Sequence, residues 1–187
     1  MSINVRPATQ GDFAALLRLD LTYPANRYLH IERSGQPPEH AFELRWRERE
    51  TPDAVYNDYP IDRLRAAQSK VDLFLVAEVG GVAIGLLMVM VPSWTDAAEI
   101  SDVAVDRGSR RSGAGKALVD AAIAWALERG YRGLWVEPSA NNAEAIEFYV
   151  RLGFRVSGFN DRLYSNEDDE PGRQTVYMHL LTTDMSR

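Results

Sequence analysis

One stretch of this chain constrains the fold more than any other, because three kinds of segment follow one another in it. Residues 100–105 form an apolar run typical of a buried strand, and residues 117–127 have the apolar spacing of an amphipathic helix. The glycines Gly113 and Gly115 lie between them. A strand, a glycine turn and a helix in this order direct backbone N–H groups and a helix N-terminus at one point. The stretch therefore predicts a phosphate-binding site.

Two well-known phosphate loops are excluded by residues that this stretch lacks. A Walker A loop needs Ser or Thr after Gly-Lys to bind magnesium, but Ala117 follows Gly115-Lys116. A dinucleotide fingerprint needs a third glycine, where this chain has Leu118. The remaining pattern is Arg-x-x-Gly-x-Gly over residues 110–115. Taken alone, a two-glycine turn before a helix is more often a simple chain reversal than a binding loop, so the rest of the sequence must decide.

Composition narrows the class of protein. The 187 residues suit one domain with one core, and the absence of cysteine excludes zinc–thiolate sites and a cysteine nucleophile. A formal net charge of -6 argues against a nucleic-acid partner. The longest apolar run, residues 82–91, is about half of the roughly 20 residues that a membrane helix needs, and no signal-peptide pattern opens the chain. We expect a soluble cytoplasmic protein with no membrane partner.

Outside the glycine loop, the spacing of apolar and turn residues predicts alternating strands and helices. The pair Gly80-Gly81 between two β-rich runs predicts a hairpin. Residues 22–62 contain five prolines among aromatic and charged residues, so we expect an irregular segment that contacts a substrate or, alternatively, covers the surface. Strands are expected at residues 3–6, 71–79, 82–91, 97–105, 133–137, 154–157 and 175–181, and helical segments at 13–21, 63–68, 117–127 and 141–152.

A second motif decides between the readings of the glycine loop. The spacing Asn142-x-x-Ala145-x-x-Phe148-Tyr149-x-x-Leu152-Gly153-Phe154 follows the run Leu134-Trp135-Val136. With the glycine loop and the opening at residues 5–9, it resembles the GCN5-related N-acetyltransferases over nearly the whole chain. The resemblance implies one N-acetyltransferase domain over residues 1–187 with an α/β (α+β) fold. Its sheet would be mixed, mostly antiparallel and flanked by helices, with a splayed strand pair at the cofactor site.

The resemblance also implies the donor, acetyl-coenzyme A, and no metal. The scattered histidines His30, His40 and His179 do not suggest a metal site either. In the family, the pantetheine arm enters the gap between the splayed strands, where Val103 and Val105 would offer main-chain groups. The pyrophosphate would be held by Arg110, Arg111, Ser112, Gly113, Ala114, Gly115 and Lys116.

The helix after residue 140 carries further candidates. Asn141 and Glu144 make a capping-box-like start, and Asn142 would either contact the pantetheine or cap this helix. Tyr149 corresponds to the family tyrosine that protonates the departing thiolate, a role that suits a phenol near sulfur. Tyr149 and Phe148 are also consistent with ordinary core aromatics.

The acceptor amine must lose a proton before it attacks, so a general base is needed unless the neutral amine is selected from solution. Glu99 is the first candidate because several family members place a glutamate there, Asp102 is the second and Glu137 the third. A strand carboxylate without a chemical role stays an open alternative. Simple alternation predicts two faces, with Glu99, Ser101, Val103 and Val105 on one and Ile100, Asp102 and Ala104 on the other.

A narrower resemblance concerns the acceptor. Residues 94–105 and 158–165 are similar to streptothricin acetyltransferases, which acetylate an amine in a polycationic antibiotic, although Ser101 stands where that group has glutamate. We therefore expect a small cationic amine as acceptor, in keeping with the acidic chain. Acetylation of protein N-termini or lysines and a non-catalytic coenzyme A-binding module remain alternatives, and a homodimer remains open.

Overall fold

The structure is a computed structural model that describes residues 2–50, 54–55, 61–163 and 173–185. The chain divides into two compact units, and each is described by itself. The first unit comprises Met1–Thr22, Tyr56–Val136 and His179–Arg187. The second comprises Tyr23–Val55 and Glu137–Met178.

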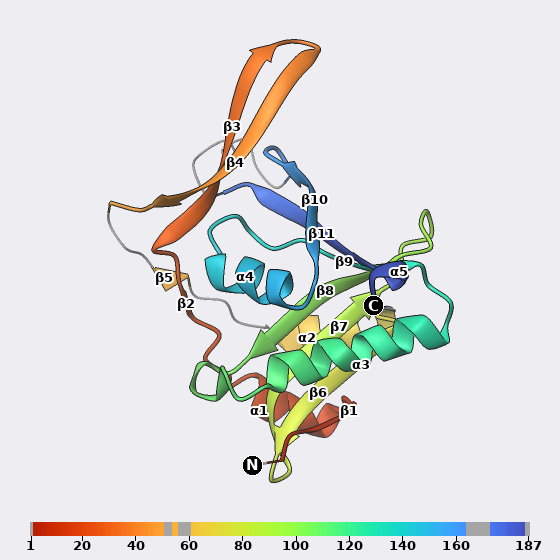
Figure 1. The fold of residues 1–187 in the computed structure, drawn as a ribbon. Helices are drawn as coiled ribbons and strands as arrows, with labels where there is room; N and C mark the ends of the chain where they lie inside the picture. The colour runs from red at the N-terminus through yellow and green to blue at the C-terminus, as the bar shows by residue number, and fades with distance from the viewer. Residues whose placement is uncertain (1, 51–53, 56–60, 164–172, 186–187) are drawn as a thin grey trace. The chain divides into compact units, whose positions relative to one another are not determined.

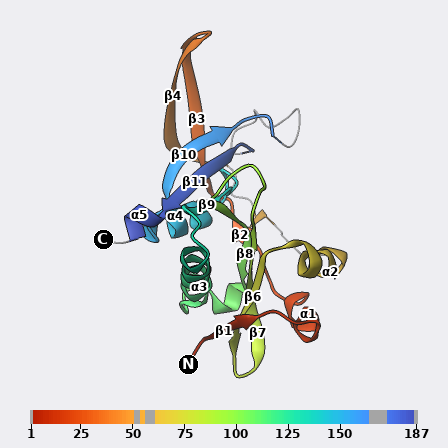
Figure 2. The ribbon, with the colours of Figure 1, turned by 90° about the vertical axis from the view of Figure 1, so that its right-hand side faces the viewer.

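The first unit is a sheet with helices on both faces, which confirms the predicted fold class (Figure 1). Its strand order is β1-β6-β7-β8-β9, antiparallel except for the parallel pair of β8 with β9. Figure 2 shows α3 on one face of this sheet, with α1 and α2 on the other. The strands are β1 (Asn4–Pro7), β6 (Leu73–Val79), β7 (Val82–Met90), β8 (Ala98–Val105) and β9 (Gly133–Val136), and the helices are α1 (Phe13–Leu16), α2 (Ile61–Lys70), α3 (Ala114–Glu128) and α5 (Thr182–Met185).

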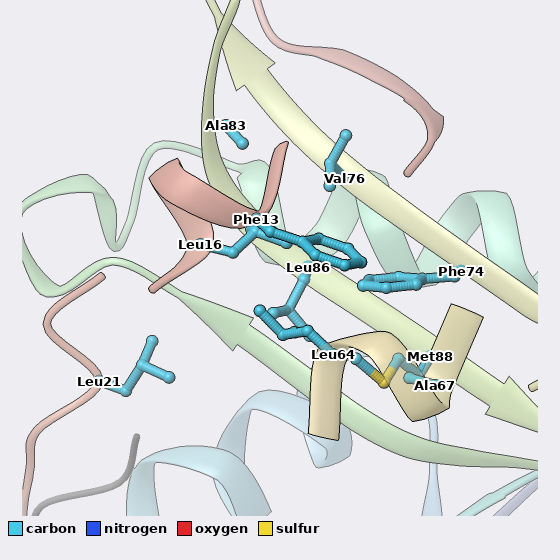
Figure 3. Packing of buried hydrophobic residues seen from close by; sticks show 10 residues of the cluster. All are labelled: Phe13, Leu16, Leu21, Leu64, Ala67, Phe74, Val76, Ala83, Leu86 and Met88. Atoms are coloured by element: carbon cyan, nitrogen blue, oxygen red, sulfur yellow. The ribbon is translucent and has the colours of Figure 1, made fainter. Parts of the chain in front are cut away.

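Alternation along β6 and β7 divides the apolar side chains between these two faces. On the α1 and α2 side, Phe13 and Leu64 pack against Phe74, Leu86 and Met88 in one buried cluster (Figure 3). The alternate side chains of β6 and β7 face α3. The buried residues of α3 recur mostly every three or four positions. These are Ala114, Leu118, Val119, Ala122 and Ala126, close to the predicted helix face.

The predicted hairpin at Gly80-Gly81 is confirmed. Both glycines have positive φ, 59° and 81°, as a two-residue turn of the favoured hand requires. The strands that it joins bury most of their apolar side chains, so the turn sets the register of two inner strands of the sheet. In the described residues, no helix is long and apolar enough to cross a membrane.

Asp12 is a buried carboxylate that ties the first turn of the chain to β1. The Arg6 guanidinium donates to both of its oxygens, at 2.7 and 2.9 Å, and Thr9 donates to Oδ2 through its backbone N–H (2.7 Å) and its hydroxyl (2.9 Å). Arg6 also pairs with Glu78 on β6 at 2.8 Å. The Arg6 hydrogen bond is the main cause that lowers the pKa of Asp12 to about 2.

We expect Asp12→Asn to lower the free energy of unfolding at pH 7 by about 1–3 kcal/mol, because it removes a buried ion pair and leaves Arg6 under-paired. The folded pKa lies below the unfolded value of 3.8, so this stabilisation is present above pH 4 and is lost as the pH falls toward 2. Urea unfolding at several pH values checks it. Asp62→Asn, at an exposed ion pair, should change stability by less than about 0.5 kcal/mol. A loss that persists unchanged at pH 2 would contradict the prediction.

In the second unit the structure corrects the expectation for residues 22–62. Most of this segment is a regular hairpin, whose ten-residue strands pair from Arg27 with Glu48 to Gln36 with Glu39. Pro37 and Pro38 lie at its turn, outside both strands, whereas residues 51–53 and 56–60 lie outside the described residues. The strands are β2 (Tyr23–Pro24), β3 (Arg27–Gln36), β4 (Glu39–Glu48), β5 (Ala54–Val55), β10 (Arg155–Asn160) and β11 (Thr175–Leu181), which ends in the first unit, and the helix is α4 (Ala143–Arg151).

The hairpin escaped prediction because both of its faces are largely exposed. Burial along β3 falls away after Ile31, and along β4 only His40 and Leu44 are partly buried. Without a buried face, a strand need not show the apolar–polar alternation on which sequence prediction depends. Charged pairs such as Glu43 with Arg45, at 2.6 Å, occupy positions that a buried strand would fill with apolar side chains.

Candidate functional site

The glycine loop of the first unit adopts an unusual backbone conformation. Arg111 and Gly113 have positive φ, 63° and 98°, and Gly113 is the N-cap of α3. The first-turn amides of Gly115 and Lys116 have no acceptor within the helix by position, whereas the Ala114 amide donates to Ser112 Oγ at 3.3 Å. The 15-residue helix adds its positive dipole end. This loop therefore has the features of an anion site.

A short 3-10 turn, η2 (Arg107–Ser109), directly precedes the loop. The Asp106 carboxylate accepts hydrogen bonds from the backbone amides of Gly108 and Asp20, both at 2.9 Å. Arg110 directs its Nε at the Val105 carbonyl, at 3.4 Å. The Lys116 ammonium pairs with Asp120 at 2.6 Å. These contacts hold the loop between the end of β8 and the start of α3.

Strands β8 and β9 separate soon after they meet, as the splayed pair was predicted to do. Their register comprises Ala98 with Leu134 and Glu99 with Trp135, and within the described residues it extends no further. β8 continues to Val105 along β7. Although β8 is an inner strand, every residue from Ser101 to Val105 is only partly buried. One edge of β8 is therefore open beyond Glu99.

The hydrogen bonds of β8 show which main-chain groups face this open edge. Asp106 donates its amide to the Ile84 carbonyl at 2.9 Å, so the main chain of Asp106 points toward β7. Main-chain polar groups point to alternate sides of a strand. Val103 and Val105 therefore direct theirs away from β7, toward the side where β9 has diverged. An extended ligand could bind there as an added strand does.

A bulge in β8 overturns the predicted assignment of the two strand faces. Met88 pairs with Asp102 but Val89 pairs with Ile100, so Ser101 is an extra residue. Paired residues share a face, and Met88 belongs to the cluster under α1 and α2. The structure therefore places Glu99, Asp102 and Ala104 on the face of α1 and α2, and Ile100, Val103 and Val105 on the face of α3.

The correction brings the two leading base candidates together. Simple alternation had separated Glu99 from Asp102, but the extra residue returns both to one face. Both are partly buried and both take part in further interactions. Ser101 hydrogen bonds to the Met88 carbonyl at 3.5 Å. A bulge beside an open strand edge is a common way of redirecting side chains at a site.

An aromatic row that sequence reasoning did not single out lies on the same face. Trp135 pairs with Glu99, and its ring is 6.5 Å from Trp94 and 6.2 Å from His179, centroid to centroid. Trp94 is 77% exposed, whereas Trp135 is buried. The available signal was a tryptophan within a turn between two predicted strands, at residues 92–96.

The remaining candidates lie in the second unit. Tyr149 of α4 is 5% exposed, and its ring lies 5.3 Å from Phe148 and 5.2 Å from Phe154. Asn142 is the N-cap of α4 and accepts the Ala145 amide at 3.1 Å, so its capping role is confirmed. The expectation that Asn141 begins this helix was wrong. Its side chain instead accepts a hydrogen bond from the Tyr23 hydroxyl at 3.2 Å. The third base candidate, Glu137, is partly buried in the second unit.

A groove of about 690 Å³ lies within the second unit, between the β3–β4 hairpin and α4. Arg27 pairs with Glu147 and covers the Trp46 ring at 4.8 Å, and Arg151 approaches Glu147 at 3.9 Å. The carboxylate is thus already paired with two cations. The rest of the lining is apolar: Leu29, Leu44, Trp46, Ile146, Val150 and Val156.

Comparison with known proteins identifies relatives of this chain. A sequence model of the acetyltransferase (GNAT) family matches residues 39–154. The chain is 34% identical over 107 residues to streptothricin acetyltransferase of Streptomyces lavendulae, which is 57% of this chain and 56% of the relative. It is 34% identical over 90 residues to the ribosomal protein bS18-alanine N-acetyltransferase of Escherichia coli K12, which is 48% of this chain and 59% of the relative. The chain thus spans little more than half the length of these curated relatives.

Solved structures match over more of the chain. Nourseothricin acetyltransferase superposes with a TM-score of 0.78 and 27% identity, over 97% of this chain and 99% of the other. A Bacillus anthracis protein described as a streptothricin acetyltransferase, solved with acetyl coenzyme A, superposes with a TM-score of 0.77 and 21% identity. That superposition covers 97% of this chain and 98% of the other and indicates a shared fold.

Proposed function

Since this chain belongs to the acetyltransferase (GNAT) family, we propose that it transfers an acetyl group from acetyl-coenzyme A directly to a primary amine. The observation that carries the proposal is the open edge of β8 beside a glycine loop at the N-terminus of α3. A chain without cysteine has no thiol to carry the acetyl group, in keeping with direct transfer. The proposal places the reaction in the cytoplasm and requires no metal.

The features of the first unit fit the proposed donor. The loop amides from Arg111 to Lys116 would bind the pyrophosphate, and the Arg110 guanidinium would add charge to that contact. The main chain of Val103 and Val105 would hydrogen bond to the amides of the pantetheine arm. Asn142 caps α4 through its Oδ1, so its side-chain NH2 group would be the part left to contact the pantetheine.

The chemistry needs one group to take a proton and one to give a proton. The amine nitrogen attacks the thioester carbonyl carbon and the carbon–sulfur bond breaks, while the amine loses a proton and the thiolate gains one. Glu99, directly or through a water, is our first choice for the base, with Asp102 second and Glu137 third. Tyr149 is our choice for the acid.

For the acceptor we propose a small cationic amine. The support is the acidic chain, the carboxylates of Glu99 and Asp102 on one face of β8, and relatives named as streptothricin acetyltransferases. A streptothricin-like antibiotic is one such acceptor. The second candidate is a protein N-terminus or lysine, favoured by the relative named as a ribosomal protein bS18-alanine N-acetyltransferase and by the apolar groove of the second unit.

A screen of acceptors tests the proposal. Release of free coenzyme A from acetyl-coenzyme A is measured with streptothricin, polyamines, amino acids and short peptides, each as a matched pair with its N-acetylated form as control. We expect acceptor-dependent release with a polycationic amine. Release with peptides alone would favour the second candidate. Tight acetyl-coenzyme A binding without release for any amine would indicate a non-catalytic module and contradict the proposal.

We expect Glu99→Gln to lower kcat/KM at neutral pH by about 100-fold, because the variant keeps the shape of the side chain but not the base. Asp102→Asn, at the second base candidate on the same face, should lower kcat/KM by less than about threefold, and the reverse order of the two effects would assign the base to Asp102. The pH profile of kcat/KM with the best acceptor from the screen provides the measurement. If both variants keep wild-type rates, the reaction selects the neutral amine and uses neither carboxylate.

A further inference from the structure

Trp94 combines features that do not follow from the transfer chemistry. Its side chain is the most exposed of the large apolar side chains in the described residues, at 77%. A tryptophan ring in water gives up a large hydrophobic gain. Such a ring is unremarkable when it is isolated and mobile, so the surroundings of Trp94 decide whether it has a role.

The turn that carries Trp94 is held at several points. The Asp96 carboxylate pairs with Arg132 Nε at 2.5 Å, and the Arg132 amide donates to the Asp96 carbonyl at 3.0 Å. The Thr95 hydroxyl accepts the Ala97 amide at 3.2 Å. The Trp94 ring itself lies against Trp135, which is buried in β9. The turn is therefore held by contacts of the protein itself, and Trp135 supports one side of the exposed ring, which lowers the entropic cost of binding.

The ring is also fixed on the face that carries the acidic side chains. Trp135 pairs with Glu99, and the bulge at Ser101 places Asp102 on the same face. His179 ends the row, and burial, with a smaller contribution from Arg132, lowers its pKa below the usual range. This shift favours the neutral form of His179. Arg132, whose charge acts on His179, is paired with Asp96.

An aromatic face next to carboxylates is a suitable environment for an organic cation. The negative face of an indole attracts ammonium and guanidinium groups, and tryptophan is the strongest of the aromatic side chains in this respect. Two other tryptophans of this chain already bind cations in this way, Trp125 under Arg129 at 4.6 Å and Trp46 under Arg27 at 4.8 Å.

We propose that Trp94, supported by Trp135, binds a second, non-reacting ammonium group of the acceptor on the face that carries Glu99 and Asp102. The inference rests on the proposed function and adds a specificity element to it. The acceptor class is then a diamine or polyamine, in which one amine takes the acetyl group while another stays protonated over the indole. A monoamine of the same length would lack this contact.

The test compares 1,5-diaminopentane with 1-aminopentane, by ligand-observed NMR titration of the full chain with coenzyme A bound. The wild-type protein is expected to prefer the diamine by about 3- to 30-fold. Trp94→Leu should reduce this preference at least threefold, and Trp94→Phe should retain part of it because a ring remains. Trp125→Leu is the matched control on α3 and should leave the preference unchanged.

The inference is overturned if Trp94→Leu keeps the wild-type preference or weakens both amines equally, since either result excludes recognition of the second charge. The binding readout also separates this inference from the proposed function. A Trp94-dependent preference for the diamine supports the ammonium site at Trp94 whether or not this diamine is acetylated, whereas the proposed function fails only if no amine of the acceptor screen releases coenzyme A. Acetylation of the diamine with a selectivity that Trp94→Leu leaves unchanged supports the proposed function and excludes the ammonium site at Trp94.

Discussion

Gly113→Val is expected to bind acetyl-coenzyme A at least about 100-fold more weakly than the wild-type protein, which corresponds to the loss of one or two charge-assisted hydrogen bonds. Gly113 has φ of 98°, a conformation that a β-branched residue avoids. An added Cβ would come no closer than 3.8 Å to Ile3 Cδ1, so the effect comes from the backbone and not from a clash. Calorimetric titration with acetyl-coenzyme A measures the affinity.

Gly130→Val is the matched control for this variant. Gly130 follows the other end of α3 with φ of 74° and open space around its missing side chain, so the same strain arises away from the loop. Both variants should lose about 1–2 kcal/mol of stability, but only Gly113→Val should lose affinity. Normal binding by Gly113→Val would exclude the loop from the donor site, and equal loss in both variants would indicate a general effect of destabilisation.

Tyr149→Phe is expected to lower kcat by about 100-fold while the Kd for acetyl-coenzyme A changes by less than about twofold. The substitution removes only the hydroxyl, so the ring still packs between Phe148 and Phe154 and the fold is retained. Loss of the acid affects the transition state more than the bound donor. Steady-state kinetics with the best acceptor and calorimetry with acetyl-coenzyme A provide the two values.

Tyr131→Phe provides the comparison, because Tyr131 stacks on Trp125 at 5.5 Å and loses the same atom. Its kcat and Kd should match those of the wild-type protein. If Tyr149→Phe lost turnover and donor affinity by the same factor, Tyr149 would be a packing residue. Unchanged turnover would assign the proton to another donor.

Local patterns of the sequence predicted much of the fold correctly. The pair Gly80-Gly81 predicted a hairpin whose turn needs positive φ at both residues, and both glycines have it. The spacing of apolar residues predicted which face of α3 is buried. The family motifs indicated the fold class and the splayed strands. These features succeed because a few neighbouring residues determine each of them.

The prediction of residues 22–62 failed for the opposite reason. The β3–β4 hairpin is long and regular, but its largely exposed faces carry no apolar stripe from which a strand could be inferred. Its pairing depends on residues up to 21 positions apart, such as Arg27 and Glu48. Two of the five prolines that suggested irregularity, Pro37 and Pro38, lie at its turn.

By itself the sequence determined the family, the sheet with its helices and the position of the glycine loop before α3. Only the tertiary structure decided which side chains of β8 share a face. The bulge at Ser101 arises from pairing with β7, which places Met88 opposite Asp102 and Val89 opposite Ile100. One extra residue reverses all later alternation, so it brings Glu99 and Asp102 to one face of β8, the face of Trp135. Period-two reasoning along one strand contains no information about its partner, and that partner decides which carboxylates lie together on one face.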